Sequence, residues 1–183
     1  MKVVIINGSG GSGKDTIVEL TRTYFSQYKV ENISTIDDVK FIAHRMGWNG
    51  IKDEKGRQFL SDLKKIWTEY NNGANLRVLQ KLVDLDNQEN FHTKEHIVFV
   101  HCRETDAIEW FIERLENRKI KTCTVLIKRE NIEKFLNSSD QNVDLYDYDI
   151  TILNNGTIEN LEKVCKKFAD IISDWDINKR ILS

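Results

Sequence analysis

The sequence has few cysteines and no proline. Its 183 residues include 3 cysteines, Cys102, Cys123 and Cys165, which lie far apart and form no CxxC pair. An odd number of widely spaced cysteines argues against a disulfide framework and against a thiolate metal site. We therefore expect reduced thiols in a cytoplasmic protein. The absence of proline indicates no particular function.

Long apolar runs and a strong charge of one sign are also absent. No apolar stretch approaches the ~20 residues that span a membrane, and the N-terminal apolar run is too short for a signal peptide. The formal net charge of -2 argues against a general nucleic-acid binder. We expect neither a membrane nor a nucleic acid as a partner. A monomer and a homodimer both stay open.

The most informative stretch is KVVIINGSGGSGKDTIVEL, residues 2–20. Val3 to Ile6 are four successive β-branched residues, typical of a parallel strand that is buried on both faces. From Thr16 onward the apolar residues recur with helical spacing. A glycine-rich segment, residues 8–14, separates the two patterns. Strand, glycine-rich loop and helix in this order predict a phosphate-binding loop, G-x-x-x-x-G-K-[ST], with Asp15 in the last place.

Such a loop suits the phosphates of ATP·Mg²⁺. Its backbone N–H groups converge on the β-phosphate, and the positive end of the following helix points at the same anion. Lys14 would reach the β- and γ-phosphate oxygens, and Thr16 would help to hold Mg²⁺. Three roles are open for Asp15: its carboxylate interacts favourably with the helix dipole, contacts the metal through water, or contacts the acceptor. The predicted ATP-binding residues in the loop are Gly8, Ser9, Gly10, Gly11, Ser12, Gly13, Lys14, Asp15 and Thr16.

The rest of the chain alternates between strand and helix patterns. The predicted strands are 3–6, 33–36, 96–101, 121–127 and 149–153, and the predicted helices after the first are 38–46, 53–72, 74–90, 104–117, 130–136 and 157–173. This alternation predicts an α/β domain over residues 1–183, a three-layer P-loop NTPase fold. Its five-stranded parallel sheet would carry helices on both faces. The consecutive helices interrupt the alternation, so we expect a helical insertion at about 40–92 that binds the substrate.

A kinase also needs fixed positive charge around the acceptor and the phosphoryl group in flight. Arg103 and Arg129 follow strand ends, where open α/β sheets bind ligands. Arg57 and Arg77 lie in the expected insertion. For each arginine the alternative is a solvated surface charge, and Arg77 is the weakest candidate.

Two acidic residues, Asp37 and Asp38, end the second predicted strand. They would orient a substrate hydroxyl or amine or help to hold a hydrated Mg²⁺. The alternative is helix N-capping, which we favour for Asp38. His101 and Cys102 suggest a Cys/His nucleophile, but no other residue supports one, and phosphoryl transfer needs none.

The loop GSGGSGKDT resembles that of phage-type deoxynucleoside monophosphate kinases and animal-type phosphomevalonate kinases, which share a G-K-D ending. Further segments are similar in order: GRQFLSDLKKIWTEYN (56–71) to an arginine-led helix, VFVHCRETDAIEWF (98–111) to a strand with D-x-R, NSSD (137–140) to H-x-S-E, and DITILNNGTIENL (149–161) to D-x-x-I-x-N-x-G-T. His101 stands where that family has an aspartate, and Asn137 and Asp140 replace its histidine and glutamate.

This resemblance implies roles for particular residues. Lys40, Arg57 and Arg103 would bind the acceptor together with Asp37, and Asn154 would lie near the adenine. Lys14, Arg103 and Arg129 would assist transfer. The implied activity moves the γ-phosphoryl group of ATP to a small phosphorylated acceptor, preferably a (deoxy)nucleoside monophosphate. The alternatives are a kinase for a non-nucleotide such as phosphomevalonate, and a regulatory nucleotide-binding protein that transfers nothing.

Overall fold

The computed structural model describes residues 1–89, 94–130, 143 and 146–183. In chain order the elements are β1 (Lys2–Asn7), α1 (Lys14–Arg22), β2 (Lys29–Ser34), α2 (Asp37–Arg45), α3 (Glu54–Asn71), α4 (Gly73–Glu89), β3 (His96–His101), α5 (Thr105–Glu116), β4 (Lys121–Lys128), β5 (Ile150–Leu153), α6 (Ile158–Asp174) and β6 (Arg180–Leu182). The predicted helix 130–136 and the segment 137–140 fall almost wholly outside the described residues.

All of the described strands form one parallel sheet in the order β2-β3-β1-β4-β5-β6. β1 lies between β3 and β4, with Lys2 opposite Ile97 on one side and Lys121 on the other. The residues Val3 to Ile6 are fully buried, as their continuous apolar pattern predicts. The predicted parallel α/β fold is therefore confirmed, with six strands in place of the expected five.

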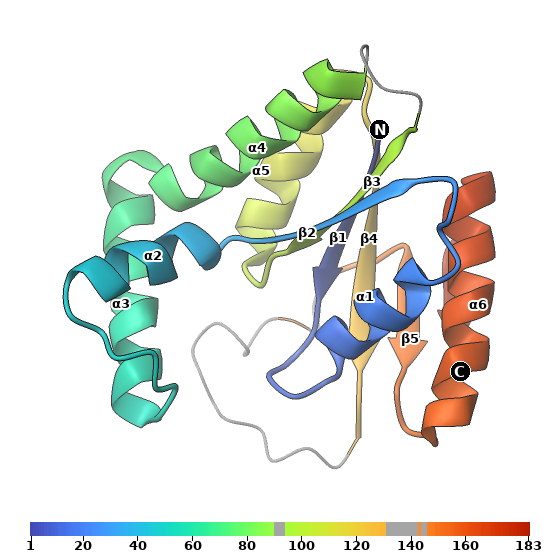
Figure 1. Ribbon diagram of the computed structural model, residues 1–183, viewed down its shortest axis with the longest axis horizontal. Coiled ribbons are helices and arrows are strands. Elements are labelled where there is room, and N and C mark those ends of the chain that lie inside the picture. Colours follow the sequence, from blue (N-terminus) through green and yellow to red (C-terminus); the bar gives the residue numbers. More distant parts are fainter. Residues whose placement is uncertain (90–93, 131–142, 144–145) are drawn as a thin grey trace.

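Helices cover both faces of the sheet (Figure 1). One face packs on α1 and α6, through a core that includes Val4, Ile6, Ile17, Phe99, Val164 and Phe168. The opposite face packs on α4 and α5, through a core that includes Val3, Ile5, Leu82, Val98, Ile108 and Phe111. Successive side chains of β1 point to opposite faces of the sheet, so they pack into two separate cores.

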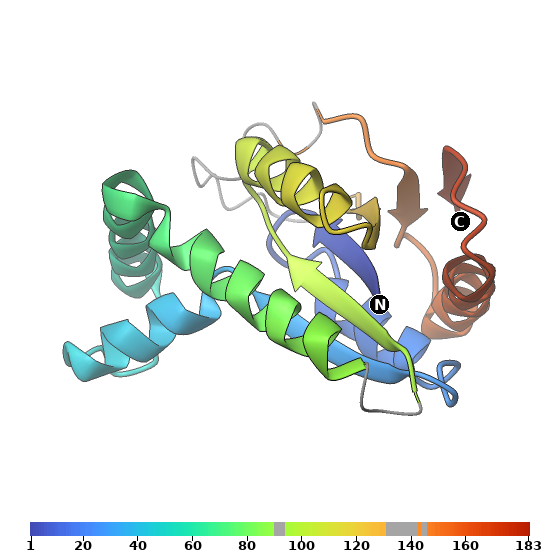
Figure 2. The same ribbon diagram turned by 90° about the horizontal axis from the view of Figure 1, so that it is seen from above.

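The helices α2 and α3 lie at one end of the molecule, beside the sheet rather than on it (Figures 1 and 2). A small cluster of Val39, Ala43, Leu60 and Ala74 joins them to the start of α4. The N-terminus of α3 is capped by Asp53, whose Oδ1 accepts a hydrogen bond from the Gly56 N–H at 2.7 Å. Asn72 ends α3 in the left-handed conformation (φ 55°) and lets the chain turn directly into α4.

Two strands differ from the prediction. The second strand was expected at 33–36 but spans Lys29–Ser34, because an edge strand needs few apolar residues and Glu31 and Asn32 hide its pattern. The sixth strand, Arg180–Leu182, was not predicted. It has only three residues and pairs at the opposite edge with β5.

Candidate active site

The loop from Gly8 to Lys14 joins the end of β1 to α1 at the centre of the sheet's carboxyl edge. Gly8 has φ +147°, and Gly13, the N-cap of α1, has φ +95°. These are conformations that glycine adopts readily and other residues rarely adopt. No side chain caps the N-terminus of α1. Its first-turn N–H groups are therefore directed at whatever anion the loop holds.

Two asparagines hold the loop in place. Asn7 Oδ1 accepts from the Gly8 N–H at 2.7 Å, and Asn7 Nδ2 donates to the Arg103 carbonyl at 3.0 Å and to the Tyr148 hydroxyl at 2.7 Å. Asn154 Nδ2 donates to the Ser12 carbonyl at 2.8 Å. Asn154 therefore positions the loop backbone. The sequence predicted only that Asn154 lies near the adenine. Asn7 was not predicted, because a single asparagine after a strand carries no signal of its own.

Lys14 and Ser12 supply the loop with polar groups that suit an anion. Lys14 Nζ donates to the carbonyl oxygens of Gly8 and Ser9, which keeps the ammonium group against the loop. Ser12 is buried, and its Oγ has no hydrogen-bond partner among the described residues. A buried hydroxyl without a partner is costly, and a phosphate oxygen would satisfy it.

One cleft of ≈ 1260 Å³ joins the loop to the helical part of the chain. Its walls come from the loop and α1, the end of β2, the start of α2, the length of α3, the start of α4 and the segment after β3. The cations that line it are Lys14, Lys40, Lys52, Arg57, Lys64, Lys65, Arg103 and Arg129. The acids that line it are Asp15, Asp37, Glu69, Glu104 and Asp106. The lining is thus rich in positive charge although the whole chain is slightly acidic.

The arginines predicted from the sequence fall into two groups, those that line the cleft and one that does not. Arg57, Arg103 and Arg129 all line the cleft with the phosphate-binding loop. Arg57 Nε donates to the Lys52 carbonyl at 2.7 Å, and this bond holds its guanidinium beside the entrance to α3. Arg77 does not line the cleft, and its Nε lies 3.9 Å from Asp38 Oδ1 on an exposed surface.

The acidic pair after β2 behaves differently from the expectation. Asp38 was favoured as an N-cap, but Ile36 occupies the cap position and Asp38 pairs with Lys81 Nζ at 2.7 Å. The helix starts one residue earlier than predicted, so Asp38 lies inside the first turn and faces α4. Asp37 lines the cleft, where its Oδ2 accepts from the Ser34 N–H at 2.8 Å. Lys40 Nζ lies 3.6 Å from Asp37 Oδ1 in the same wall.

Asp15 and His101 meet at the foot of the loop. Asp15 has a side chain that is 92% exposed, and its Oδ1 lies 3.8 Å from Nε2 of the nearly buried His101. Burial lowers the pKa of His101; the Asp15 carboxylate opposes this shift, and the Lys14 ammonium adds to it. His101 is therefore neutral at pH 7, and its Nε2 has no hydrogen-bond partner among the described residues.

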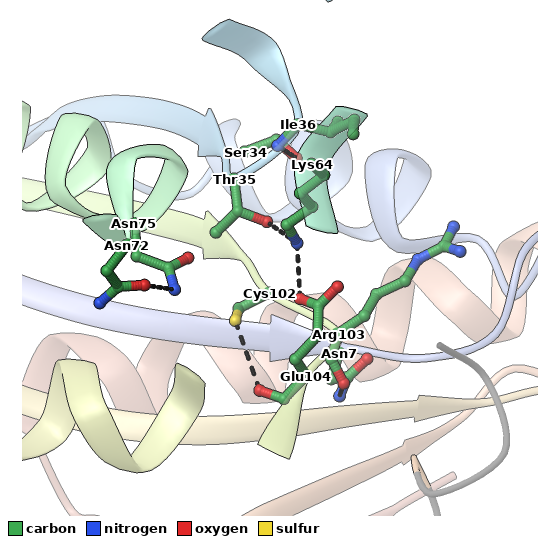
Figure 3. Close-up of polar contacts among 10 residues, drawn as sticks. All are labelled: Asn7, Ser34, Thr35, Ile36, Lys64, Asn72, Asn75, Cys102, Arg103 and Glu104. Atoms are coloured by element: carbon green, nitrogen blue, oxygen red, sulfur yellow. Dashed lines mark hydrogen bonds and ion pairs between the residues drawn. The ribbon is translucent and has the colours of Figure 1, made fainter. Parts of the chain in front are cut away.

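A further polar group, which sequence reasoning missed, connects α3 to the segment after β3 (Figure 3). Lys64 Nζ donates to Glu104 Oε2 at 2.6 Å and to Thr35 Oγ1 at 2.9 Å. Burial raises the pKa of the Glu104 carboxyl, but its contacts with the Lys64 ammonium and with its own backbone N–H bring the pKa below its usual value. Glu104 is therefore an anion in the cleft at neutral pH. A lysine in an amphipathic helix has the same pattern as any solvated charge, so nothing in the sequence distinguished Lys64.

Cys102, Cys123 and Cys165 are free and buried. Burial raises the pKa of the Cys102 thiol to about 12. A thiol with that pKa is protonated at neutral pH and is not a nucleophile.

The residues around the loop fit a magnesium ion that is held mainly by phosphates and water. The described residues contain no cluster of three or more His, Cys, Asp or Glu side chains that could hold a metal ion. Mg²⁺ usually keeps several waters and binds through one or two protein groups and substrate phosphates. Thr16 and Asp15, which line the cleft beside Lys14, supply a hydroxyl and a carboxylate for this purpose.

Comparison with known proteins supports the fold. No family model matches the sequence, and no curated protein sequence matches it. The structure is similar to that of APE1195, with 13% sequence identity over 94% of this chain and 95% of that chain and a TM-score of 0.53. Weaker likenesses include an APS kinase, CysC, from Mycobacterium tuberculosis (12% identity, 94% and 96% coverage, TM-score 0.47) and TT1252 from Thermus thermophilus (15%, 92% and 96%, TM-score 0.47). At these identities the likeness concerns the fold, and the scores below 0.5 support no further conclusion.

Within the described part of the chain, none of the helices has the length and apolarity needed to cross a membrane.

Proposed function

We propose that the protein is an ATP-dependent phosphotransferase that moves the γ-phosphoryl group of ATP·Mg²⁺ to a small phosphorylated acceptor. The acceptor that we favour is a (deoxy)nucleoside monophosphate. One observation carries this proposal: a single cleft holds both the phosphate-binding loop and a second set of cations, which includes Lys40, Arg57 and Arg103. A protein that only hydrolyses or stores a nucleotide has no need of the second set.

Each set would bind one polyanion. Residues 8–16 would bind the triphosphate through the loop backbone and Lys14, and Lys40 and Arg57 would bind the acceptor phosphate together with Arg103. Lys14, Arg103 and Arg129 would hold positive charge around the group in transfer. Magnesium, when bound, neutralises charge on the β- and γ-phosphate oxygens. The protein's contribution is positioning and electrostatic stabilisation without a covalent intermediate.

A second candidate function has one observation in its favour. His101 stands where the resembled kinases have an aspartate, and its buried imidazole is neutral rather than anionic. A neutral group at that position favours a protein that binds the nucleotide and transfers its phosphoryl group slowly or not at all. A kinase for a non-nucleotide phosphate ester remains the third alternative.

The proposal is tested with the variant Lys14→Ala in a coupled assay of ADP release with a panel of acceptors. Loss of the ammonium group should lower kcat by at least about 100-fold, since a charge contact made in the transition state contributes several kcal/mol. The midpoint of chemical denaturation should stay close to that of the wild type.

Lys166→Ala is the matched control, because Lys166 is an exposed lysine of α6. It should leave kcat unchanged. Wild-type protein that binds ATP but shows no acceptor-dependent ADP release would instead support the binding function, and unchanged transfer in Lys14→Ala would remove Lys14 from the mechanism.

A further inference from the structure

Two buried polar atoms on the inner wall of the cleft have no partner among the described residues. Asn75, in the first turn of α4, is 3% exposed, and its Nδ2 donates to Asn72 Oδ1 at 2.8 Å. The remaining atom, Asn75 Oδ1, accepts no hydrogen bond, and Thr68 Oγ1 in the last turn of α3 is likewise buried and unpaired. Both residues line the cleft. A buried polar atom without a partner costs about 1–3 kcal/mol, which a suitable ligand group would recover.

These atoms lie apart from the charge that would hold a phosphate. In Figure 3 the Asn72–Asn75 pair lies on one side of the Lys64–Glu104 contact, and the Arg103 side chain extends away on the other side. The Arg103 carbonyl accepts from Asn7, which in turn holds Gly8, so Arg103 is adjacent to the phosphate-binding loop. The cleft therefore has one end at Arg103, beside the loop, and another end at Asn75.

The cleft also has apolar walls. Leu60 of α3 and Ala107 and Trp110 of α5 line the same cleft as Asn75 and Thr68. A pocket with apolar walls and a few fixed polar groups is typical of a site that binds an organic head group in one orientation.

The unpaired atoms restrict the chemistry of that head group. Asn75 Oδ1 can only accept a hydrogen bond, and a threonine hydroxyl can accept or donate one. Two lysines of α3 line the cleft: Lys64 bonds Glu104 and Thr35, and the exposed Lys65 has its Nζ 3.9 Å from Glu69 Oε1. A carboxylate head would therefore meet lysines that already have acidic partners, and it would face the lone pairs of Asn75.

We propose that Asn75 and Thr68 form a specificity pocket for the end of the acceptor opposite its phosphate. The pocket selects a head group with N–H donors, such as the amino or imide group of a nucleobase, over a carboxylate or over a sugar phosphate that carries no head group. The proposal rests on the phosphotransferase function above. It adds two residues that determine the specificity for the head group of the acceptor.

The test compares acceptors with and without the head group. The probes are the four deoxynucleoside 5′-monophosphates and 2-deoxyribose 5-phosphate, which has the same sugar phosphate and no base. For the wild type, kcat/KM for at least one nucleotide should exceed that for 2-deoxyribose 5-phosphate by about 100-fold or more. Equal use of both kinds of acceptor would overturn the proposal.

The variant Thr68→Val replaces the hydroxyl with a methyl group of similar size. It should raise KM for the preferred nucleotide about tenfold, with little change in kcat, and leave KM for 2-deoxyribose 5-phosphate unchanged. Thr68→Ser restores the hydroxyl and should bring KM back to within about threefold of the wild type. Asn75→Leu should act in the same direction as Thr68→Val. Equal losses with both kinds of acceptor would show a merely structural role and contradict the proposal.

Failure of the phosphotransferase function would be recognised separately, as ATP binding without transfer to any probe. Calorimetric titration of each deoxynucleotide into protein that holds a non-hydrolysable ATP analogue would then measure binding to the pocket directly. A deoxynucleotide that binds to the wild type and about tenfold more weakly to Thr68→Val would support the pocket. If none of the four binds, the proposal is wrong.

Discussion

At the scale of single residues, the glycines of the phosphate-binding loop are not equivalent. A Cβ atom on Gly8 would lie 2.5 Å from the Ile127 carbonyl oxygen, and its φ of +147° strains any other residue. A Cβ atom on Gly10 would meet nothing within 4 Å. A Cβ atom is therefore sterically excluded at Gly8 and tolerated at Gly10.

We predict that Gly8→Ala destabilises the protein and that Gly10→Ala does not. The first variant forces apart the main chains of the loop and β4, which should cost about 2 kcal/mol or more. The second should change the free energy of unfolding by less than about 0.5 kcal/mol. Chemical denaturation of both variants measures the difference, and equal stabilities would show that the loop relaxes freely around residue 8.

At the scale of elements, the contact between Lys64 and Glu104 ties the helical part of the molecule to the sheet. It is a short ion pair, partly buried, between α3 and the residue that precedes α5. Removing one member of such a pair leaves the other charge without its ion-pair partner and without full hydration.

We predict that Lys64→Met lowers the free energy of unfolding by about 1–3 kcal/mol at pH 7. The double variant with Glu104→Gln should recover part of this loss. Since the pKa of Glu104 is depressed in the folded state, the pair stabilises the protein above the usual carboxyl range, and this contribution is lost as pH falls through the folded pKa. Urea denaturation at pH 7 and pH 4 measures both effects; additive single effects in the cycle would show that the contact contributes nothing.

The elements also show which patterns predict structure. β1 and β3 are buried on both faces, so their apolar runs identified them, and the glycine-rich pattern located the loop between β1 and α1. β2 and β6 are edge strands whose residues need little burial, so the apolar pattern misplaced β2 and did not mark β6. Thr68 and Asn75 were missed for another reason: they look like ordinary helical polar residues until α3 and α4 place them against the cleft.

At the scale of the whole molecule, charge is distributed unevenly. The chain is slightly acidic, yet eight cations and five acids line the cleft. A concave surface with an excess of one sign attracts an anionic substrate, and dissolved salt screens this attraction.

We predict that the acceptor KM rises about threefold or more between 0.05 and 0.5 M salt, with a smaller change in kcat, because the Debye length falls from about 14 to about 4 Å. Arg103→Ala should flatten this dependence, since Arg103 lines the cleft. Arg77→Ala, outside the cleft, is the control and should keep the wild-type slope. Steady-state kinetics at four salt concentrations would measure the slopes, and equal slopes for all three proteins would exclude Arg103 from substrate attraction.

The central place of β1 has a consequence for synthesis on the ribosome. β1 precedes both of its partners in the chain, β3 and β4, with Ile97 and Lys121 opposite Lys2. Four of its residues are fully buried in the folded protein, so during synthesis this apolar segment stays unpaired until residues 96–128 have also been made. Pairing of β1 is therefore late and non-local, and until then the nascent chain exposes a segment of the kind that aggregates.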